Sequence, residues 1–371
     1  MKLFRNILIW IMSCFFTFGN AKTQTTVTTP IRLAVAGISH GHSAFILNRH
    51  DKTDFIIVGI YEPNQDLALK EAQHYNFDRK LLYSDLIEML DSVKPEAVAA
   101  FGSIYDHMAV VEACAPRGIH VMVEKPLATN VEHAVRMLEL AQKYRIYLLT
   151  NYETSWYPST AKSFQLVNDS NFVRGIKKVV FHDGHQGPKE IGVSKEFLEW
   201  LTDPVKNGGG ALIDFGCYGA NLMTYLKKGE MPVSVTAVTQ HFKPDVYPKV
   251  DDEATIIISY PNSQCIIQAS WNWPFSRKDM EIYGEEGYII AVDNKTMRVR
   301  NRNMETEITR MVTSNDVLVY EDPFVYFAGV LKGKIKIIPY DLYSLENNVM
   351  VVKILSAARE SAQTGKSVLL K

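Results

Sequence analysis

Cysteine is scarce in this chain, with four cysteines among 371 residues. Cys14 lies in an apolar N-terminal segment, and Cys114, Cys217 and Cys265 are far apart in the sequence. This spacing fits neither a disulfide framework nor a zinc site. We therefore expect the last three cysteines to be small buried apolar side chains and expect no metal site.

An excess of charge of either sign is also missing. The 40 basic and 41 acidic residues leave a formal net charge of −1. Surfaces that bind nucleic acid or anionic lipid normally carry a basic excess or cluster. The composition therefore predicts neither kind of partner. There is no low-complexity tract and no internal repeat of solenoid period, so the chain has the composition of an ordinary globular protein.

Long hydrophobic runs are absent, and the apolar run 7–18 is too short to span a bilayer comfortably. Lys2 and Arg5 precede it, and Gly19 and Ala21 supply small residues at −3 and −1. These features predict a secretory signal peptide over residues 1–21, and hence a periplasmic or secreted protein without membrane contact after cleavage. A membrane anchor and a buried first helix are the alternatives. Lipid attachment at Cys14 is disfavoured because "FFTF" follows it.

The chain is longer than one hydrophobic core usually supports, which predicts two domains. After a flexible leader (22–30), residues 31–150 alternate Val- and Ile-rich strands with amphipathic helices, as in a doubly wound parallel sheet of the α/β class. Residues 151–340 contain longer strands separated by turns, which predicts an α+β domain with a mostly antiparallel sheet open on one face. Residues 341–371 form a C-terminal helix and tail, expected to pack back on the first domain.

The stretch "GISHGHS" follows the first predicted strand where a dinucleotide-binding chain has its glycine-rich loop. Gly37 and Gly41 give the backbone the freedom that this turn needs. Ser39 and His42 occupy positions where glycine or alanine is usual. Alone, the stretch is therefore a weak fingerprint, and an ordinary strand–turn–helix unit remains open.

Glu62 strengthens the nucleotide interpretation. It ends the second predicted strand, where a carboxylate accepts hydrogen bonds from both adenosine ribose hydroxyls and repels a 2′-phosphate. This predicts NAD rather than NADP as the cofactor. The alternative is that Glu62 caps the next helix, because Pro63 suits a first helical turn.

Two further motifs carry chemistry. "HVMVEKPLATN" places Lys125 at the carboxyl end of a parallel strand, the edge where ligands bind in such sheets. "NGGGALIDFGCYGANLMTYL" places Asp214 and Tyr218 four residues apart on one helical face. A cation near Tyr218 is expected to lower the pKa of its phenol and fit it for proton transfer. Considered without its context, Lys125 is more simply a solvated or salt-bridged lysine.

With these motifs the chain resembles the Gfo/Idh/MocA family of nicotinamide-dependent oxidoreductases, in its glucose–fructose oxidoreductase and dihydrodiol and xylose dehydrogenase-like branch. The resemblance rests on "EKP" together with "GGG…D-x-G-x-Y" and extends over the mature chain. It implies an N-terminal Rossmann domain and an α+β domain whose open sheet commonly forms a homo-oligomer interface. It also implies reversible hydride transfer at a sugar or polyol carbon, with Lys125, Asp214 and Tyr218 as catalytic residues.

The cofactor contacts expected from the loop, from Glu62 and from the family motifs are Gly37, Ser39, His40, Gly41, Glu62, His107, Glu124 and Lys125. His107 is equally consistent with a surface histidine at a helix start. His40 or His42 is expected to help retain the cofactor.

The substrate contacts expected in the interdomain cleft are Glu153, Trp156 and His185. Trp156 is placed to stack on a pyranose, although a core tryptophan is the commoner outcome. His185 is preferred to His182 because the two point to opposite faces of a continuing strand. Trp200 is expected to be a packing residue.

Export raises a physical difficulty, because no replenished pool of free NAD exists outside the cytoplasm. A tightly held NAD, recycled within each turnover, resolves it. Two other functions stay open at this stage. One is an NAD-dependent glycoside hydrolase that acts through transient sugar oxidation, and the other is a non-catalytic sugar-binding protein.

Overall fold

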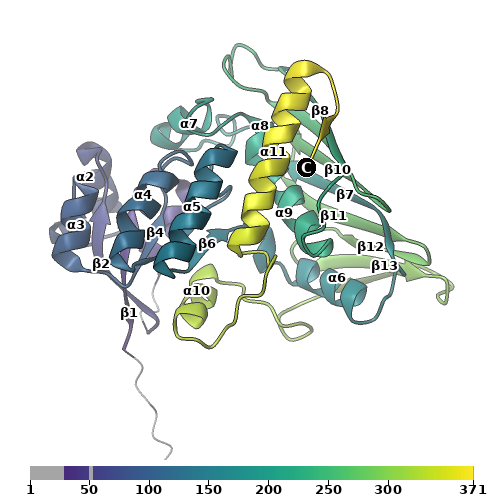
Figure 1. The fold of residues 1–371 in the computed structure, drawn as a ribbon, viewed down its shortest axis with the longest axis horizontal. Coiled ribbons are helices and arrows are strands. Elements are labelled where there is room, and N and C mark those ends of the chain that lie inside the picture. The colour runs from purple at the N-terminus through teal and green to yellow at the C-terminus, as the bar shows by residue number, and fades with distance from the viewer. Residues whose placement is uncertain (1–28, 50–52, 371) are drawn as a thin grey trace, which may run out of the picture.

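The computed structural model describes residues 29–49 and 53–370 (Figure 1). The predicted signal peptide 1–21, Cys14 and most of the predicted leader lie outside these ranges. Among the described residues, no helix is both long and apolar enough to cross a membrane.

The first sheet has six parallel strands in the order β3-β2-β1-β4-β5-β6. These strands are β1 (Ile31–Ala36), β2 (Phe55–Tyr61), β3 (Leu82–Tyr83), β4 (Ala97–Ala100), β5 (His120–Glu124) and β6 (Leu148–Asn151). Its helices are α1 (Ala44–Leu47), α2 (Gln65–His74), α3 (Leu86–Val93), α4 (His107–Cys114) and α5 (Val131–Tyr144). This strand order is that of a Rossmann fold, so the predicted doubly wound sheet is confirmed.

Local sequence explains these elements. Every residue of β4 is buried, as expected of a central strand covered on both faces. The side chains of Asn64, Asp85 and Asn130 accept backbone N–H groups at the starts of α2, α3 and α5. The helix after the glycine loop is short: a 3₁₀ turn (Gly41–Ser43) precedes the four residues of α1.

The second sheet has nine strands in the order β14-β13-β12-β11-β7-β10-β9-β8-β15, all antiparallel except for the β7–β10 pair. They are β7 (Ile176–Gly184), β8 (Ser234–Gln240), β9 (Glu253–Ser259), β10 (Gln264–Ser270), β11 (Arg277–Gly284), β12 (Gly287–Ala291), β13 (Thr296–Asn301), β14 (Ile308–Met311) and β15 (Val368–Leu369). The helices after residue 151 are α6 (Pro158–Asn168), α7 (Lys195–Leu201), α8 (Ala211–Asp214), α9 (Gly216–Leu226), α10 (Pro323–Leu331) and α11 (Leu345–Thr364).

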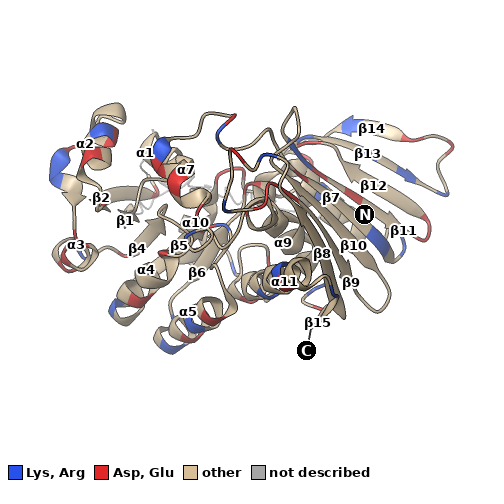
Figure 2. Ribbon diagram, turned by 90° about the horizontal axis from the view of Figure 1, so that it is seen from above, with Lys and Arg blue, Asp and Glu red and all other residues tan. Residues whose placement is uncertain are grey.

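One face of this second sheet is covered and the other is open. In β7, Val179 and Phe181 are buried toward α9, whereas Val180 and His182 alternate with them and are only half-buried. Figure 2 shows α9 and α11 on the inner side of the sheet, and no helix of the described chain on its outer side. The predicted open, mostly antiparallel sheet is therefore confirmed.

Helix α11 connects the two sheets and lies between them in Figure 1. Val349 and Val352 belong to a core cluster with residues of the parallel sheet. Val351 and Leu355 belong to the core beneath the second sheet. The helix therefore buries two apolar faces at once and holds the parallel sheet beside the antiparallel one.

Candidate active site

A buried ion pair lies where the two sheets meet. Lys125 follows β5, and its Nζ lies 2.5 Å from Oδ1 of Asp214 and 3.1 Å from the Asp214 carbonyl oxygen. Their side chains are 8% and 7% exposed. Lys125 is therefore salt-bridged, and its partner is the aspartate that the second motif singled out.

The two charges stabilise each other. Burial opposes the charge of Lys125, but Asp214 outweighs it and the pKa of the lysine is raised. Burial likewise opposes the charge of Asp214, and Lys125 outweighs it, so the pKa of the aspartate is lowered. Both groups are therefore ionised at neutral pH.

The run of three glycines before Asp214 allows a close contact between this segment and the backbone of Asp251. A Cβ on Gly210 would lie 1.8 Å from the Asp251 carbonyl oxygen, so no larger residue fits there. The Asp251 carboxylate accepts from the N–H groups of Gly210 (3.0 Å) and Leu212 (2.7 Å). The indole of Trp271 donates to Oδ2 of Asp214 at 3.0 Å. Neither Asp251 nor Trp271 was identified from the sequence, because both come from other elements of the second sheet.

Tyr218 lies next to the pair on α9. Lys125 Nζ is 5.3 Å and Lys278 Nζ is 5.1 Å from the centre of the Tyr218 ring. The expected lowering of the Tyr218 pKa is wrong: burial, and then the nearby carboxylate of Glu153, raise that pKa well above its ordinary value. The physical reason is that Asp214 already neutralises Lys125, so burial dominates.

The glycine loop adopts the turn that its sequence predicts. Gly37 has φ +77°, and a Cβ there would lie 2.7 Å from the backbone of Gly102. A Cβ on Gly41 would meet no atom within 4 Å, so open space lies beside that backbone. Ser39 accepts a hydrogen bond from the Trp200 indole at 3.1 Å. Trp200 is thus buried, as expected of a packing residue, and also ties α7 to the loop.

The two loop histidines have different surroundings. His40 is buried with its ring 4.4 Å from that of Phe197, and burial lowers its pKa well below the ordinary value. His42, where a small residue is usual, lies with Nδ1 2.9 Å from Oε2 of Glu124. Oε1 of Glu124 accepts from the Asn151 amide at 2.8 Å. His42 therefore joins the loop to the "EKP" segment instead of disrupting it.

Glu62 contacts the start of the next helix, as the alternative interpretation suggested, and its contact with a ribose stays a prediction. Its carboxylate is buried and accepts the N–H of Ile38 in the loop and the N–H of Asn64, each at 3.0 Å. Asn64 is the residue that caps α2. Glu62 therefore braces the glycine loop and the next helix start while standing at the end of β2.

His107 is fully buried, so it is not a surface histidine. Its Nδ1 lies 3.1 Å from the Leu127 carbonyl oxygen, and burial lowers its pKa to about 4. The neutral ring therefore donates from Nδ1 and keeps an acceptor at Nε2, a buried atom without a partner among the described residues. With the open space at Gly41 and the carboxylate of Glu62, this acceptor fits the needs of a nicotinamide dinucleotide.

A cavity of about 610 Å³ is lined by Glu153 and His185 of the expected substrate residues and by Lys278, whose Nζ lies 5.1 Å from the centre of the Tyr218 ring. Lys278, from β11, forms an ion pair with Glu153 there. His185 accepts the Gly187 N–H at Nδ1, so its neutral ring presents Nε2–H as a donor. Burial lowers the pKa of His185, which keeps the ring neutral. Lys278 was not named as a site residue from the sequence, because the sequence does not show how β11 pairs with its neighbouring strands.

Trp156 does not line this cavity. Its ring packs edge-on against Phe45 at 5.1 Å, and its indole donates to Asn151 at 3.0 Å. The structure therefore places it beside the β6 end and the glycine loop rather than with Glu153 and His185. A larger hollow of about 760 Å³, between α4 and α5, contains none of the expected site residues.

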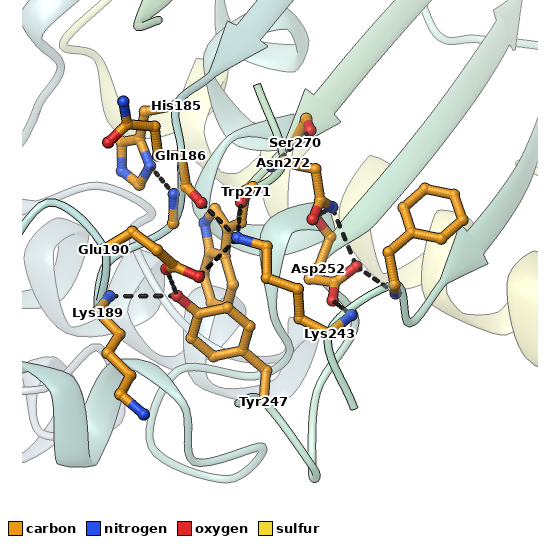
Figure 3. Close-up of polar contacts among 12 residues, drawn as sticks. His185, Gln186, Lys189, Glu190, Lys243, Tyr247, Asp252, Ser270, Trp271 and Asn272 are labelled. Carbon is orange, nitrogen blue, oxygen red and sulfur yellow. Dashed lines mark hydrogen bonds and ion pairs between the residues drawn. The ribbon is translucent and has the colours of Figure 1, made fainter. Parts of the chain in front are cut away.

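A polar clamp holds the segment that carries His185 (Figure 3). Lys243 Nζ donates to the Gln186 carbonyl, to Glu190 (2.7 Å) and to the Trp271 carbonyl (2.7 Å). Tyr247 donates to the other Glu190 oxygen. Because Trp271 also contacts Asp214, the clamp fixes the His185 segment relative to the buried ion pair.

Family models match this architecture in two parts. An oxidoreductase family with an NAD-binding Rossmann fold matches residues 31–152. The GFO/IDH/MocA C-terminal domain matches residues 176–290. The chain belongs to the GFO/IDH/MocA oxidoreductase family.

Individual relatives agree with this membership of the GFO/IDH/MocA family. The chain is 26% identical over 237 residues to trans-1,2-dihydrobenzene-1,2-diol dehydrogenase of Xenopus tropicalis, covering 64% of this chain and 67% of the relative. It is 20% identical over 356 residues to D-xylose 1-dehydrogenase [NADP(+)] of Haloarcula marismortui, covering 94% and 95% of the two chains. An inositol dehydrogenase homologue from Azotobacter vinelandii, solved with NAD+, has the same fold, with a TM-score of 0.78 at 16% identity over 93% of this chain and 98% of that one.

Proposed function

We propose that this protein is a nicotinamide-dependent oxidoreductase that transfers a hydride to or from a hydroxyl-bearing carbon of a sugar or polyol. The observation that carries the proposal is the buried Lys125–Asp214 pair beside Tyr218, at the carboxyl edge of a Rossmann sheet. The named relatives are sugar, inositol and dihydrodiol dehydrogenases, which supports this reaction class. They give no support to the glycoside hydrolase or to the non-catalytic sugar-binding protein.

The cofactor-binding role falls to the first sheet. A bound nicotinamide supplies the hydride acceptor or donor. The loop of Gly37, Ser39, His40 and Gly41 would hold the pyrophosphate, and Glu62 the adenosine ribose. Glu124 and His107 would contact the nicotinamide end. Glu62 supports NAD as the cofactor, because a buried carboxylate at that place disfavours a 2′-phosphate.

The proton-transfer role falls to the second motif. Lys125, held charged by Asp214, lies within reach of a substrate oxygen placed near Tyr218 and stabilises negative charge there. The Tyr218 hydroxyl has no partner among the described residues and is kept protonated by burial. It is therefore prepared to donate a proton to a carbonyl oxygen in the reducing direction. In the oxidising direction the Tyr218 hydroxyl must first lose its own proton, and its oxygen can then accept the proton of the substrate alcohol.

Three further features belong to the proposal. Residues 1–21 direct export, the NAD is held tightly and is returned to its oxidised form within each turnover by transferring the hydride to a second sugar, and copies of the chain associate through the open face of the second sheet. The closure of α7 over the loop through Trp200 and Ser39 supports tight retention.

The direct test is to purify the mature protein, denature it and assay the supernatant for a nicotinamide dinucleotide. A panel of neutral sugars and inositols is then tested in pairs of hydride donor and acceptor. The absorbance of the reduced nicotinamide follows reduction of the bound cofactor by the donor, and analysis of the sugar products follows turnover. We expect bound NAD and turnover of at least one member of the panel. Protein from which the cofactor has been removed should turn over no member. Lys125→Met and Tyr218→Phe should abolish turnover while retaining the cofactor. A protein that neither contains nor binds a nicotinamide dinucleotide would refute the proposal.

A further inference from the structure

Asp183, at the end of β7, is a buried carboxyl group that the proposed chemistry does not use. It is 2% exposed. Its Oδ2 is buried without a hydrogen-bond partner among the described residues. A buried polar group without a partner costs about 1–3 kcal/mol of stability. Such a cost is commonly tolerated where the group serves a ligand.

The position of Asp183 ties it to the proposed site. In the β7–β11 ladder it lies directly opposite Lys278, the residue whose Nζ is 5.1 Å from the Tyr218 ring. The next two residues along β7 and its extension, Gly184 and His185, line the 610 Å³ cavity together with Lys278. Asp183 therefore lies next to two residues of the cavity lining in the chain and opposite a third in the sheet.

The surroundings of Asp183 favour the neutral form of its carboxyl group. Burial raises its pKa well above the ordinary value, and Lys278 opposes the shift without cancelling it. The lysine is already paired with Glu153. A protonated carboxyl group has one donor and further acceptor capacity, which is the pattern that complements an alcohol group.

The cationic side chains that line the cavity are each paired with a carboxylate. Each of the cationic side chains Lys278, Arg277 and Arg298 has a carboxylate partner, in Glu153, Asp279 and Glu307. The His185 ring is neutral. An anionic substrate such as a sugar acid finds no unpaired cation among these groups, so the lining suits an uncharged polyhydroxylated molecule.

We infer that Asp183 is a specificity-determining residue that hydrogen-bonds a hydroxyl group of an uncharged sugar or polyol, other than the hydroxyl that reacts. This inference rests on the proposed function. It assigns a substrate contact to a residue outside the "EKP" and "GGG…D-x-G-x-Y" motifs.

The test compares three variants with the wild type in the NAD-loaded protein, using the best neutral sugar of the panel. Asp183→Leu replaces the unpartnered carboxyl with an apolar group of similar size. It should raise the melting temperature by roughly 1–3 °C and raise KM about five- to tenfold, the equivalent of one lost hydrogen bond. Asp183→Asn keeps a donor and an acceptor and should keep KM within about threefold.

Tyr260→Phe is the matched control. Tyr260 is also buried with an unpartnered hydroxyl. Tyr260 comes directly after the last residue of β9. The first residue of that strand, Glu253, lies beside Trp271, which contacts the buried ion pair. Seven residues of strand separate it from that start, roughly 23 Å at about 3.3 Å per residue. This variant should raise the melting temperature as well but leave KM unchanged.

The monodeoxy analogues of the sugar complete the test. One analogue should lose five- to tenfold in kcat/KM with the wild type and nothing further with Asp183→Leu, because the contact is already absent. An Asp183→Leu protein with the KM of the wild type would overturn the assignment and leave the proposed function intact. If the wild type holds NAD yet neither binds nor oxidises any neutral sugar, the proposed function and this inference both fail.

Discussion

Lys125 Nζ and Asp214 Oδ1 lie 2.5 Å apart, although they are 89 positions apart in the chain, Lys125 directly after β5 and Asp214 at the end of α8. Their side chains are almost entirely buried. The pair therefore joins the carboxyl edge of the Rossmann sheet to the first helices of the second domain. Proton transfer and the alignment of the two halves depend on the same contact.

Removing one member of this pair should destabilise the protein strongly. Lys125→Met leaves the Asp214 carboxylate buried without its counter-charge, and we expect a loss of about 3–5 kcal/mol in the free energy of unfolding. Adding Asp214→Asn should restore most of that loss, because the amide still accepts from the Trp271 indole. Urea unfolding measures both values. Neither variant should turn over a sugar, and a double variant as unstable as Lys125→Met alone would contradict the charge argument.

The raised pKa of Tyr218 predicts different pH profiles for the two reaction directions. Below that pKa the phenol holds its proton, so the reduction of a ketone or aldehyde should depend little on pH up to about pH 9. Oxidation of the alcohol needs the ionised phenol and should accelerate about tenfold per pH unit over the same range. Initial rates in both directions from pH 6 to 9 measure this. An oxidation rate that is flat above pH 7 would show that another group accepts the proton.

The fold could be predicted from local patterns in the sequence, and the same kind of pattern named Lys125, Asp214 and Tyr218 as candidate catalytic residues. Buried strands such as β4 alternate with capped helices, and "EKP" and "D-x-G-x-Y" are short motifs, so each can be recognised in a single window. Asp183, Lys278 and Trp271 could not be found in this way. Their roles arise from the ladder of β7 and β11 and from the end of β10, and cross-strand pairing between distant segments leaves no local pattern.

One expectation, the lowered pKa of Tyr218, differed from the structure for an electrostatic reason, and the position of Trp156 depends on the local backbone. The Tyr218 pKa was expected to be low because a lysine is near, but the charge of Lys125 is cancelled by Asp214 at shorter range. Trp156 was expected to meet the substrate because it follows β6. The 3₁₀ turn over Glu153–Trp156 carries its ring toward Phe45 instead. The spacing of residues along the chain predicts neither the neutralisation of Lys125 by Asp214 nor the direction of the Trp156 ring.

Glu62 is expected to decide which dinucleotide is bound. Glu62→Gln keeps the shape of the side chain and one carbonyl acceptor for the N–H of Ile38 or Asn64, but removes the negative charge. The preference for NAD over NADP should fall at least tenfold. The reason is that the repulsion between the Glu62 carboxylate and a 2′-phosphate bound beside it costs more than about 1.4 kcal/mol in a partly buried site. Dissociation constants for both dinucleotides, measured by titration calorimetry, test it. A variant with an unchanged preference would mean that Glu62 only braces the loop.

The contact between Trp200 and Ser39 should control how long the cofactor stays bound. Trp200→Phe keeps an aromatic ring against His40 and Phe197 but removes the indole N–H that Ser39 accepts. Because this bond ties α7 to the glycine loop, its loss should speed the release of NAD about three- to tenfold, as expected for one hydrogen bond. Ser39→Ala removes the acceptor instead and should have at least the same effect, because Ser39 also belongs to the proposed pyrophosphate loop, and adding Trp200→Phe to it should speed release no further. Release is followed by trapping freed NAD with a second enzyme. Additive effects of the two substitutions would show that they act separately, and unchanged release in all three variants would show that α7 does not retain the cofactor.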